Sequence, residues 1–242
     1  MSRQQAAQLR SASERAERAE QALARLPEMK EKKEAGKESE ARVSSSDPEA
    51  TVMKMADGGY RPAYNIHYST DCHKQVIVGV EVLKTGSDQG QLKPMLEQIE
   101  DRLGARPKKA VVDGGFVKLE EIPEIEKGKE GKTPTTVYMP VPKPKNDKRD
   151  PHKPLPGDSE EVGQWRVRMG TEEGKAIYKL RGQTAECINA QARNRGLIRL
   201  LVRGLHKVKS VALWFAATHN MARFFSLLPQ PPPLEPTVPL FT

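Results

Sequence analysis

Short apolar strands alternate with helical segments between residues 63 and 142, and no other feature restricts the fold of this chain as strongly. Residues 63–70 and 75–83 have the composition of two strands around a polar turn at Asp71–Lys74. A helix is expected next, capped by Ser87 or Asp88 and closed by Gly104. Its apolar residues recur on one stripe, namely Leu92, Met95, Leu96, Ile99 and Leu103.

The following segments continue the alternation. "AVVD" at 110–113 is a short apolar strand, "LEEIPEIEKG" supplies one or two helical turns, and "TTVYMPVP" is a further strand. This order predicts an α/β fold, in which helices pack on a mixed sheet. In such folds the ends of the strands hold ligand-binding groups.

We divide the chain into three parts. Residues 1–46 are predicted to form a helical, charged N-terminal segment, residues 47–227 a folded domain, and residues 228–242 a disordered, proline-rich tail. Inside the domain, residues 142–164 lack periodicity and are expected to form a long loop. Helices are expected at about 171–195 and 208–227.

The N-terminal helix is expected to run from residue 3 to about residue 26, with Pro27 ending or kinking it. Its apolar residues are spaced three and four apart, which is typical of a coiled-coil or helical-hairpin seam. They are Leu9, Ala12, Ala16, Ala19, Leu23 and Leu26. The alanines among them weaken this seam, since they bury little apolar surface.

The composition excludes several classes of protein. No run of about 18 apolar residues is present, so no membrane span or membrane partner is expected. The N-terminus lacks the apolar region of a secretion signal, which favours the cytoplasm. Two cysteines and five scattered histidines match neither a disulfide framework nor a zinc site.

The net charge of +8 is located in one part of the chain. Residues 166–226 contain twelve lysines and arginines but only three acidic residues, while the preceding segments are nearly balanced. Positive charge concentrated in one segment favours a polyanionic partner such as DNA, although a solvated basic surface would give the same pattern.

Asp113 ends the apolar strand in "KKAVVDGGF". A carboxylate there is held by the sheet and points beyond its edge, and Gly114 and Gly115 allow a close approach of backbone or ligand. Asp113 is therefore the first candidate catalytic and metal-binding residue.

The second candidate acid, Glu186, lies in the predicted C-terminal helix. Tyr178 and Arg181 are one turn apart, Glu186 is about two turns past Tyr178, and Arg193 is two turns past Glu186. A carboxylate, an aromatic ring and guanidinium groups on one side of a helix suit a metal-bound phosphodiester. A purely structural salt bridge from Glu186 to Arg181 or Arg193 is an equally simple interpretation.

These motifs resemble the DDE transposases of bacterial insertion sequences that have a ribonuclease-H-like catalytic domain. The resemblance covers residues 40–226 and rests on "DPEATVMKMADGGYRPAYNIHYSTD", "VVDGGF" and "IYKLRGQTAECINAQARNRGLIRLLVRGL". The Tyr178–Arg181–Glu186–Arg193 pattern has four residues between Arg and Glu where related groups often have three, and it ends in Arg instead of Lys.

The resemblance implies that Asp113 and Glu186 are catalytic and bind Mg²⁺ in a two-metal site. It also implies that the substrate is DNA, namely the ends of an insertion sequence and its target. Tyr178, Arg181 and Arg193 would contact this DNA, and Arg195, Arg199 and Arg203, spaced four residues apart, are further DNA-binding candidates. The bacterial cytoplasm, in association with the nucleoid, is the expected location.

The resemblance also implies an acid that this chain does not supply. The first catalytic Asp of the family lies on a first core strand, whereas Asp47, Asp57 and Asp71 lie in loop or turn sequences. We therefore expect the chain to be truncated at its N-terminus, to lack the first core strand and to be inactive alone.

Two alternatives remain open at this stage. The chain could be a non-catalytic remnant that binds DNA, or pairs with itself or with an intact transposase, through the three arginines and the Leu9–Leu26 seam. It could also be a decayed reading frame without a function.

Overall fold

The computed structural model describes residues 1–55, 57–128, 133–143 and 149–229. Its α-helices are α1 (Arg3–Glu31), α2 (Leu92–Leu103), α3 (Ile122–Lys127), α4 (Glu160–Gly170), α5 (Glu172–Arg181), α6 (Cys187–Asn194) and α7 (Leu205–Leu227). Single 3₁₀ turns lie at Glu38–Glu40 and Leu119–Glu121, and a π-helical segment, Gly182–Glu186, joins α5 to α6. The strands are β1 (Thr51–Lys54), β2 (Tyr60–Ala63), β3 (Asn65–Thr70), β4 (Ile77–Leu83), β5 (Lys109–Val111) and β6 (Thr136–Tyr138).

The strands pair in twos. Strands β1 and β2 form one antiparallel hairpin, β3 and β4 form a second, and β5 and β6 form a parallel pair. The prediction of an α/β fold is confirmed, but one continuous mixed sheet is not found among the described residues. Strand periodicity fixes which face of a strand is apolar, yet pairing also needs a neighbouring strand at the correct distance.

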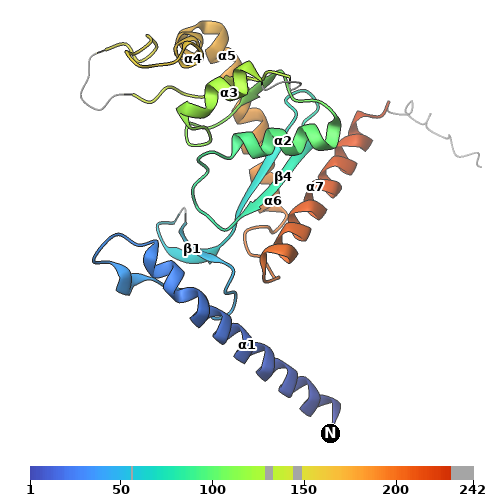
Figure 1. Cartoon of the computed structure of the whole chain (residues 1–242). Coiled ribbons are helices and arrows are strands. Elements are labelled where there is room, and N and C mark those ends of the chain that lie inside the picture. The colour runs from blue at the N-terminus through green and yellow to red at the C-terminus, as the bar shows by residue number, and fades with distance from the viewer. Residues whose placement is uncertain (56, 129–132, 144–148, 230–242) are drawn as a thin grey trace, which may run out of the picture.

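The β3–β4 hairpin has helices on both faces (Figure 1). Val80 and Val82 of β4 pack in one apolar cluster with residues of α6 and α7, whereas Gly79, directly before Val80, lies against Met95 of α2. Ile77 joins Val80 in this cluster because the register shifts beside Ser69 and Thr70, so that β4 contains one extra residue. The predicted hairpin, with its buried second strand, is therefore present.

A second apolar cluster surrounds the β5–β6 pair. It contains Ala110 of β5, Val137 of β6, Ile122 of α3, Leu96 of α2 and Trp165 of α4. Because α2 also packs on β4, it connects the two cores.

Helix α1 extends away from the rest of the molecule (Figure 1). It continues through Pro27 to Glu31, so of the two predicted effects of this proline, ending the helix is not found. The Arg25 side chain attaches the last turns of α1 to the backbone oxygens of Pro48 and Ala50. Two leucines of the predicted seam are largely solvent-exposed, at 57% for Leu9 and 70% for Leu23, and the third, Leu26, is half-buried.

Several boundaries differ from the sequence-based expectation. The hairpin β1–β2 was not predicted, since its strands are only four residues long and carry Pro62 and two charged residues. Neither Ser87 nor Asp88 caps α2, which begins after Gln91, but Gly104 closes it in the left-handed conformation, with φ 73°. Helix α4 begins inside the predicted 142–164 loop, capped by Ser159.

The predicted tail at 228–242 lies almost entirely outside the described residues. In the part of the chain that is described, none of the helices has the length and apolar character needed to cross a membrane.

Candidate active site

Asp113 lies two residues beyond β5. The parallel pairing continues past the strand, because the Val112 N–H donates to the Tyr138 carbonyl at 3.0 Å. The chain then turns, with the Phe116 N–H donating to the Asp113 carbonyl at 3.1 Å. The Asp113 side chain is 56% exposed, so the strand end presents a carboxylate to solvent, as predicted.

The two glycines after Asp113 differ in their surroundings. A Cβ atom at Gly114 would approach Pro140 Cγ at 3.3 Å, so this glycine lets the turn pack closely on the segment after β6. At Gly115 a Cβ atom would meet only open space. Close packing against the Pro140 side chain therefore accounts for Gly114.

Helix α4 holds the C-terminal helices against β5 and β6. Trp165 is fully buried, and its indole N–H donates to the Met139 carbonyl at 3.1 Å. Arg168 contacts the Glu126 carboxylate and donates to the Val137 carbonyl at 3.2 Å. Since α5 follows α4 after Thr171, these contacts bring Tyr178 and Arg181 beside the end of β5.

Arg181 joins the two candidate acids. Its Nη1 atom lies 3.0 Å from Asp113 Oδ2, and its Nη2 atom lies 2.8 Å from Glu186 Oε1. The Arg181 side chain is 25% exposed, whereas Glu186 is 60% exposed. The structure thus brings Asp113 and Glu186 to one guanidinium, although 73 residues separate them in the sequence.

The π-helical segment makes the Arg181–Glu186 contact possible. In a regular α-helix, residues five apart are about 140° apart around the axis and do not face each other. A π-helix hydrogen-bonds residues five apart, so it brings these two onto one side. The extra residue between Arg and Glu, noted in the sequence, is absorbed here without loss of the contact.

Tyr178 packs beside this pair. The Arg181 guanidinium lies 5.8 Å from the centre of the Tyr178 ring, and the tyrosine also packs against the core around β5 and β6. Burial raises the pKa of the Tyr178 phenol; the Arg181 charge opposes this rise and the Asp113 charge adds to it. The phenol therefore stays protonated near neutral pH and can donate a hydrogen bond.

The other basic candidates lie beyond this cluster. Arg193 is exposed in the last turn of α6, and Arg195 is the C-cap of α6, with its guanidinium 5.9 Å from the Phe215 ring. Arg199 and Arg203 are exposed in the turns between α6 and α7. Their spacing of four residues therefore does not place them on one helix, because α6 ends at Asn194 and Gly196 has a φ of 92°.

The remaining candidate aspartates have local partners. Asp47 accepts hydrogen bonds from the Tyr64 hydroxyl at 3.0 Å and from the Gly204 N–H at 3.1 Å, so it supports the start of α7. Asp57 pairs with Arg61, and Asp71 accepts from backbone N–H groups of its own turn. None of the three contacts the Asp113–Arg181–Glu186 cluster in these interactions.

Among the described residues, no group of three or more Asp, Glu, His or Cys side chains is arranged to bind a metal ion. Asp113 and Glu186 have the oxygen donors that Mg²⁺ prefers, and Mg²⁺ is commonly held by one or two carboxylates together with water and substrate phosphates. A cation of that kind fits these donors only where it replaces the Arg181 guanidinium.

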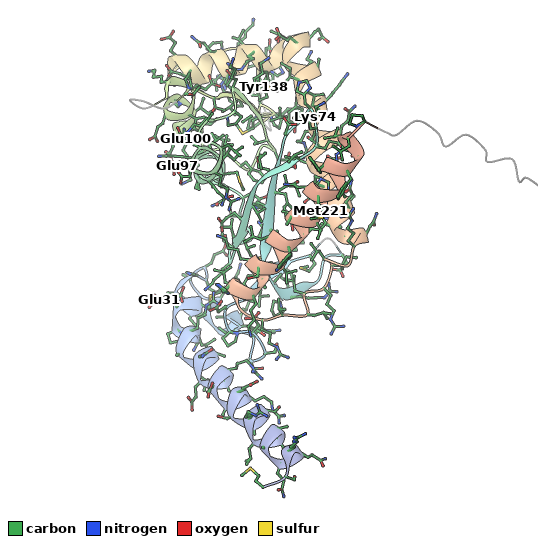
Figure 2. All side chains as sticks on the ribbon, turned by 90° about the vertical axis from the view of Figure 1, so that its right-hand side faces the viewer. Glu31, Lys74, Glu97, Glu100, Tyr138 and Met221 are labelled. Atoms are coloured by element: carbon green, nitrogen blue, oxygen red, sulfur yellow. The ribbon has the colours of Figure 1, made fainter. Side chains whose placement is uncertain are left out.

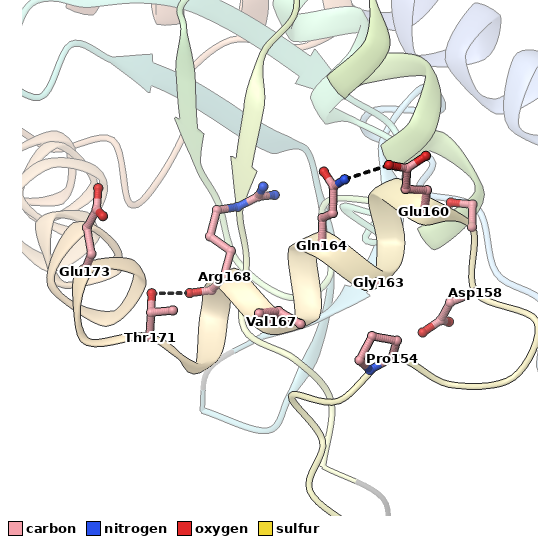
Figure 3. Close-up of a pocket in the computed structure, with 10 residues that line it drawn as sticks. Pro154, Asp158, Glu160, Gly163, Gln164, Val167, Arg168, Thr171 and Glu173 are labelled. Atoms are coloured by element: carbon pink, nitrogen blue, oxygen red, sulfur yellow. Dashed lines mark hydrogen bonds between the residues drawn. The ribbon is translucent and has the colours of Figure 1, made fainter.

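A pocket of about 630 Å³ lies along α4 (Figure 3). Pro154, Gly163, Val167, Arg168 and Thr171 are among its lining residues, and neither candidate acid contributes to it. The pocket is therefore separate from the candidate active site.

The described site is thus a pair of exposed acids bridged by one arginine beyond the end of a strand. Comparison with known families adds a second observation. Residues 153–225 match a family model described as a transposase DDE domain. This part of the chain is therefore similar to transposase DDE domains, in agreement with the resemblance seen in the sequence motifs.

The matched region contains Glu186 and all of the basic candidates but not Asp113. Searches of curated proteins and of solved structures gave no match. The salt bridge between Arg181 and Glu186, one of the alternatives that the sequence left open, is present. The contact that the sequence did not reveal is the one from Arg181 to Asp113. No local signal indicates this contact, because 68 positions separate the two residues.

Proposed function

We propose that this chain carries part of the active site for Mg²⁺-dependent DNA strand cleavage and transfer in the transposition of an insertion sequence. The observation that carries the proposal is the convergence of Asp113 and Glu186 on Arg181, at 3.0 and 2.8 Å. Two acids from distant segments meet at the end of a strand, inside or next to the region that matches a transposase DDE domain.

Asp113 and Glu186 would hold the metal in this proposal. When bound, Mg²⁺ supplies activation of the attacking oxygen and stabilisation of the leaving oxygen. Arg181 neutralises the charges of the two carboxylates when no metal is bound. When metal replaces it there, its guanidinium would be free to bind a phosphate of the DNA. Tyr178, kept protonated, can donate to a phosphate oxygen or stack on a base.

We further propose a ribonuclease-H-like core from which one strand is absent. The described strands support this, since β3 pairs only with β4 and β5 pairs only with β6, leaving an unpaired edge on each pair. The two pairs are close together, because the His67 ring of β3 lies 5.0 Å from the Phe116 ring after β5. A strand between these edges would add a third acid beside Asp113, as the family resemblance implies.

This arrangement predicts little or no activity for the chain alone. The test is a Mg²⁺-dependent nicking assay on DNA carrying the ends of the insertion sequence, with the chain alone and with the coding segment upstream of Met1 fused in frame. Cleavage is expected only for the extended protein. Asp113→Ala and Glu186→Gln should abolish it, whereas Glu173→Gln, which changes an exposed acid on α5, should leave it intact.

Efficient cleavage by the chain alone, lost in Asp113→Ala, would show that the proposed inactivity is wrong. Cleavage by the extended protein that survives both acid substitutions would refute the assigned roles of Asp113 and Glu186.

A second candidate function is favoured by the exposed basic residues after Glu186. Arg193, Arg195, Arg199 and Arg203 are all exposed and follow one another along α6 and the turns before α7. A chain that binds DNA through them without cleaving it could compete with an intact transposase at the nucleoid. Retained binding with no cleavage in the extended protein would favour this function.

A further inference from the structure

Helix α7 is apolar on two opposite faces. One face carries Val208, Ala212, Phe215 and Ala216, all of which are buried against the β3–β4 hairpin and α6. The opposite face carries large side chains that are exposed: Trp214 at 71%, Met221 at 62%, Phe224 and Phe225 at 60% each, and Leu228 at 42%. Figure 2 looks onto this side of the molecule and labels Met221 on it. A helix with apolar residues all round is normally covered on both sides.

The exposed face also lacks charge. From Val211 to Leu228 the one charged residue is Arg223, whose Nε–H donates to the Lys74 carbonyl at 2.9 Å. The basic character of the C-terminal part of the chain is thus absent from this face, and DNA is not a suitable partner for it. The face requires an apolar partner.

The spacing of the exposed residues identifies that partner. Trp214, Ala217, Met221, Phe225 and Leu228 follow at steps of three and four, which is the pattern of a helix–helix contact. Met221 lies seven residues from both Trp214 and Leu228, and four residues from both Ala217 and Phe225. The stripe is therefore symmetric about Met221. If a second such helix runs antiparallel to the first, the small Ala217 of one helix lies opposite the large Phe225 of the other.

We propose that α7 packs antiparallel against α7 of a second copy of this chain, on a two-fold axis at Met221. In this arrangement Trp214 lies opposite Leu228 of the other copy and Ala217 lies opposite Phe225, so each surface complements itself. Helix α1 is a poor substitute, because its surface is charged and its apolar seam consists half of alanine.

The exposed stripe is large enough for such a contact. An aromatic side chain carries about 150–250 Å² of surface, so the exposed parts of three aromatic residues, one methionine and the flanking leucines amount to roughly 600–700 Å² per copy. A specific interface needs at least about 1,000 Å² in total, or about 500 Å² per partner. The dimer does not depend on the proposed DNA chemistry.

Disulfide trapping tests the axis directly. The test uses a chain that carries Cys72→Ser and Cys187→Ala, so that no native thiol competes. In it, Met221→Cys is expected to form a reducible dimer on mild oxidation, because residue 221 of one copy faces residue 221 of the other across the axis. Trp214→Cys and Leu228→Cys should not cross-link separately but should do so when the two chains are mixed. Ala222→Cys, exposed on the same helix but away from the stripe, is the control and should stay monomeric.

Sedimentation equilibrium tests the association itself. The unmodified chain is expected to be a dimer at micromolar concentration, and Met221→Glu should convert it to a folded monomer with unchanged helix content. Ala222→Glu adds the same charge outside the stripe and should remain dimeric.

Three results would overturn the proposal. They are a monomer at every concentration, a dimer that Met221→Glu leaves intact, and cross-linking of Trp214→Cys chains with one another. A monomer at every concentration would mean that another segment or another protein covers the stripe. Cross-linking of Trp214→Cys chains with one another would show that the two helices pack parallel.

Discussion

Single residues decide whether the two acids can bind a metal, and Arg181 is the most important of them. Its guanidinium contacts Asp113 and Glu186 together, so it neutralises charge that a metal would otherwise neutralise. The sequence shows an arginine near a glutamate; the contact with Asp113 depends on how α5 packs beside β5.

Replacing Arg181 should therefore have opposite effects on metal and on DNA. Exposed ion pairs contribute up to about 1 kcal/mol each, so Arg181→Ala is expected to tighten Mn²⁺ binding roughly five- to tenfold. It should weaken DNA binding and lower the salt slope by about one. Electron paramagnetic resonance of Mn²⁺ and fluorescence anisotropy of labelled DNA measure the two effects.

Lys179→Ala is the matched control, since it removes one exposed positive charge from the same helix. It should leave Mn²⁺ affinity unchanged. Equal Mn²⁺ affinity in Arg181→Ala and the unmodified chain would contradict the assigned role of Arg181.

A second residue-scale prediction concerns stability against acid. Asp158 and Arg166 form a largely buried pair at 2.7 Å, with side chains 12% and 8% exposed. Burial alone would raise the pKa of Asp158, but hydrogen bonds from Arg166 and the Leu155 N–H outweigh it and lower the pKa. A lowered pKa stabilises the fold above the unfolded-state value of about 3.9, and this stabilisation is lost as the pH falls through the folded-state value.

Asp158→Asn is therefore expected to lower the free energy of unfolding by about 3 kcal/mol at pH 7, because it leaves the Arg166 charge buried without its partner. Urea denaturation at a series of pH values measures this difference, which should shrink below about pH 4. A difference that stays constant down to pH 2 would show that lost packing, and not the ion pair, is responsible.

At the scale of elements, the π-helical segment Gly182–Glu186 adds one residue to the helix without rotating the residues of α6 after it. Ile188 and Ala192 of α6 stay buried against β4 and α7 as a result. A regular helix through residues 171–195, as the sequence predicts, would turn these side chains by about 100°.

Deleting Gly182 should convert the π-segment to α-helix and leave α6 in place. Arg181 and Glu186 would then be four residues apart and still in contact. The expected result is a free energy of unfolding that is unchanged or about 1 kcal/mol higher, since a glycine leaves a helix interior. Urea denaturation followed by circular dichroism provides the measurement.

Deleting Ala176 from the regular helix α5 is the control. It should destabilise the protein by several kcal/mol, because every later side chain of the helix rotates off its packing surface. If both deletions destabilise the protein equally, the π-helical segment does not accommodate an extra residue in the way described here.

At the scale of the whole molecule, charge and apolar surface are separated. The exposed arginines after Glu186 lie on α6 and in the turns between α6 and α7, whereas the uncharged stripe covers the outer side of α7. This division allows one part of the molecule to contact DNA while another contacts a second copy.

DNA binding should accordingly depend steeply on salt through this basic region. Replacing Arg193, Arg195, Arg199 and Arg203 with alanine is expected to reduce the slope of log K against log salt by about three to four. Titrations between 50 and 200 mM salt, an interval of about fourfold, would measure the slope by fluorescence anisotropy.

The matched control removes four positive charges elsewhere. It carries Arg3, Arg10, Arg15 and Lys30 changed to alanine on α1, all of them on the part of the molecule farthest from the basic region in sequence. It should lower the affinity only slightly and leave the slope nearly unchanged. Equal changes in both variants would mean that net charge alone attracts DNA.

The sequence by itself determined several of the elements and the candidate residues. Alternation along 77–83, the apolar stripe of α2 with Gly104 after it, and an acid at the end of an apolar strand are local patterns, so neighbouring residues suffice to indicate them. Glu186 and the basic residues near it are also indicated by a local pattern, since the motif that contains them spans only about 30 residues. The family match over residues 153–225 agrees with that motif.

Only the tertiary structure decided how these parts meet. Pairing of the strands in twos, the bridge from Arg181 to Asp113 across 68 residues, and the exposure of the outer face of α7 each depend on which surfaces are covered by distant segments. Periodicity shows that a face is apolar but not which segment packs on it, because burial is a property of the folded chain and not of the residue.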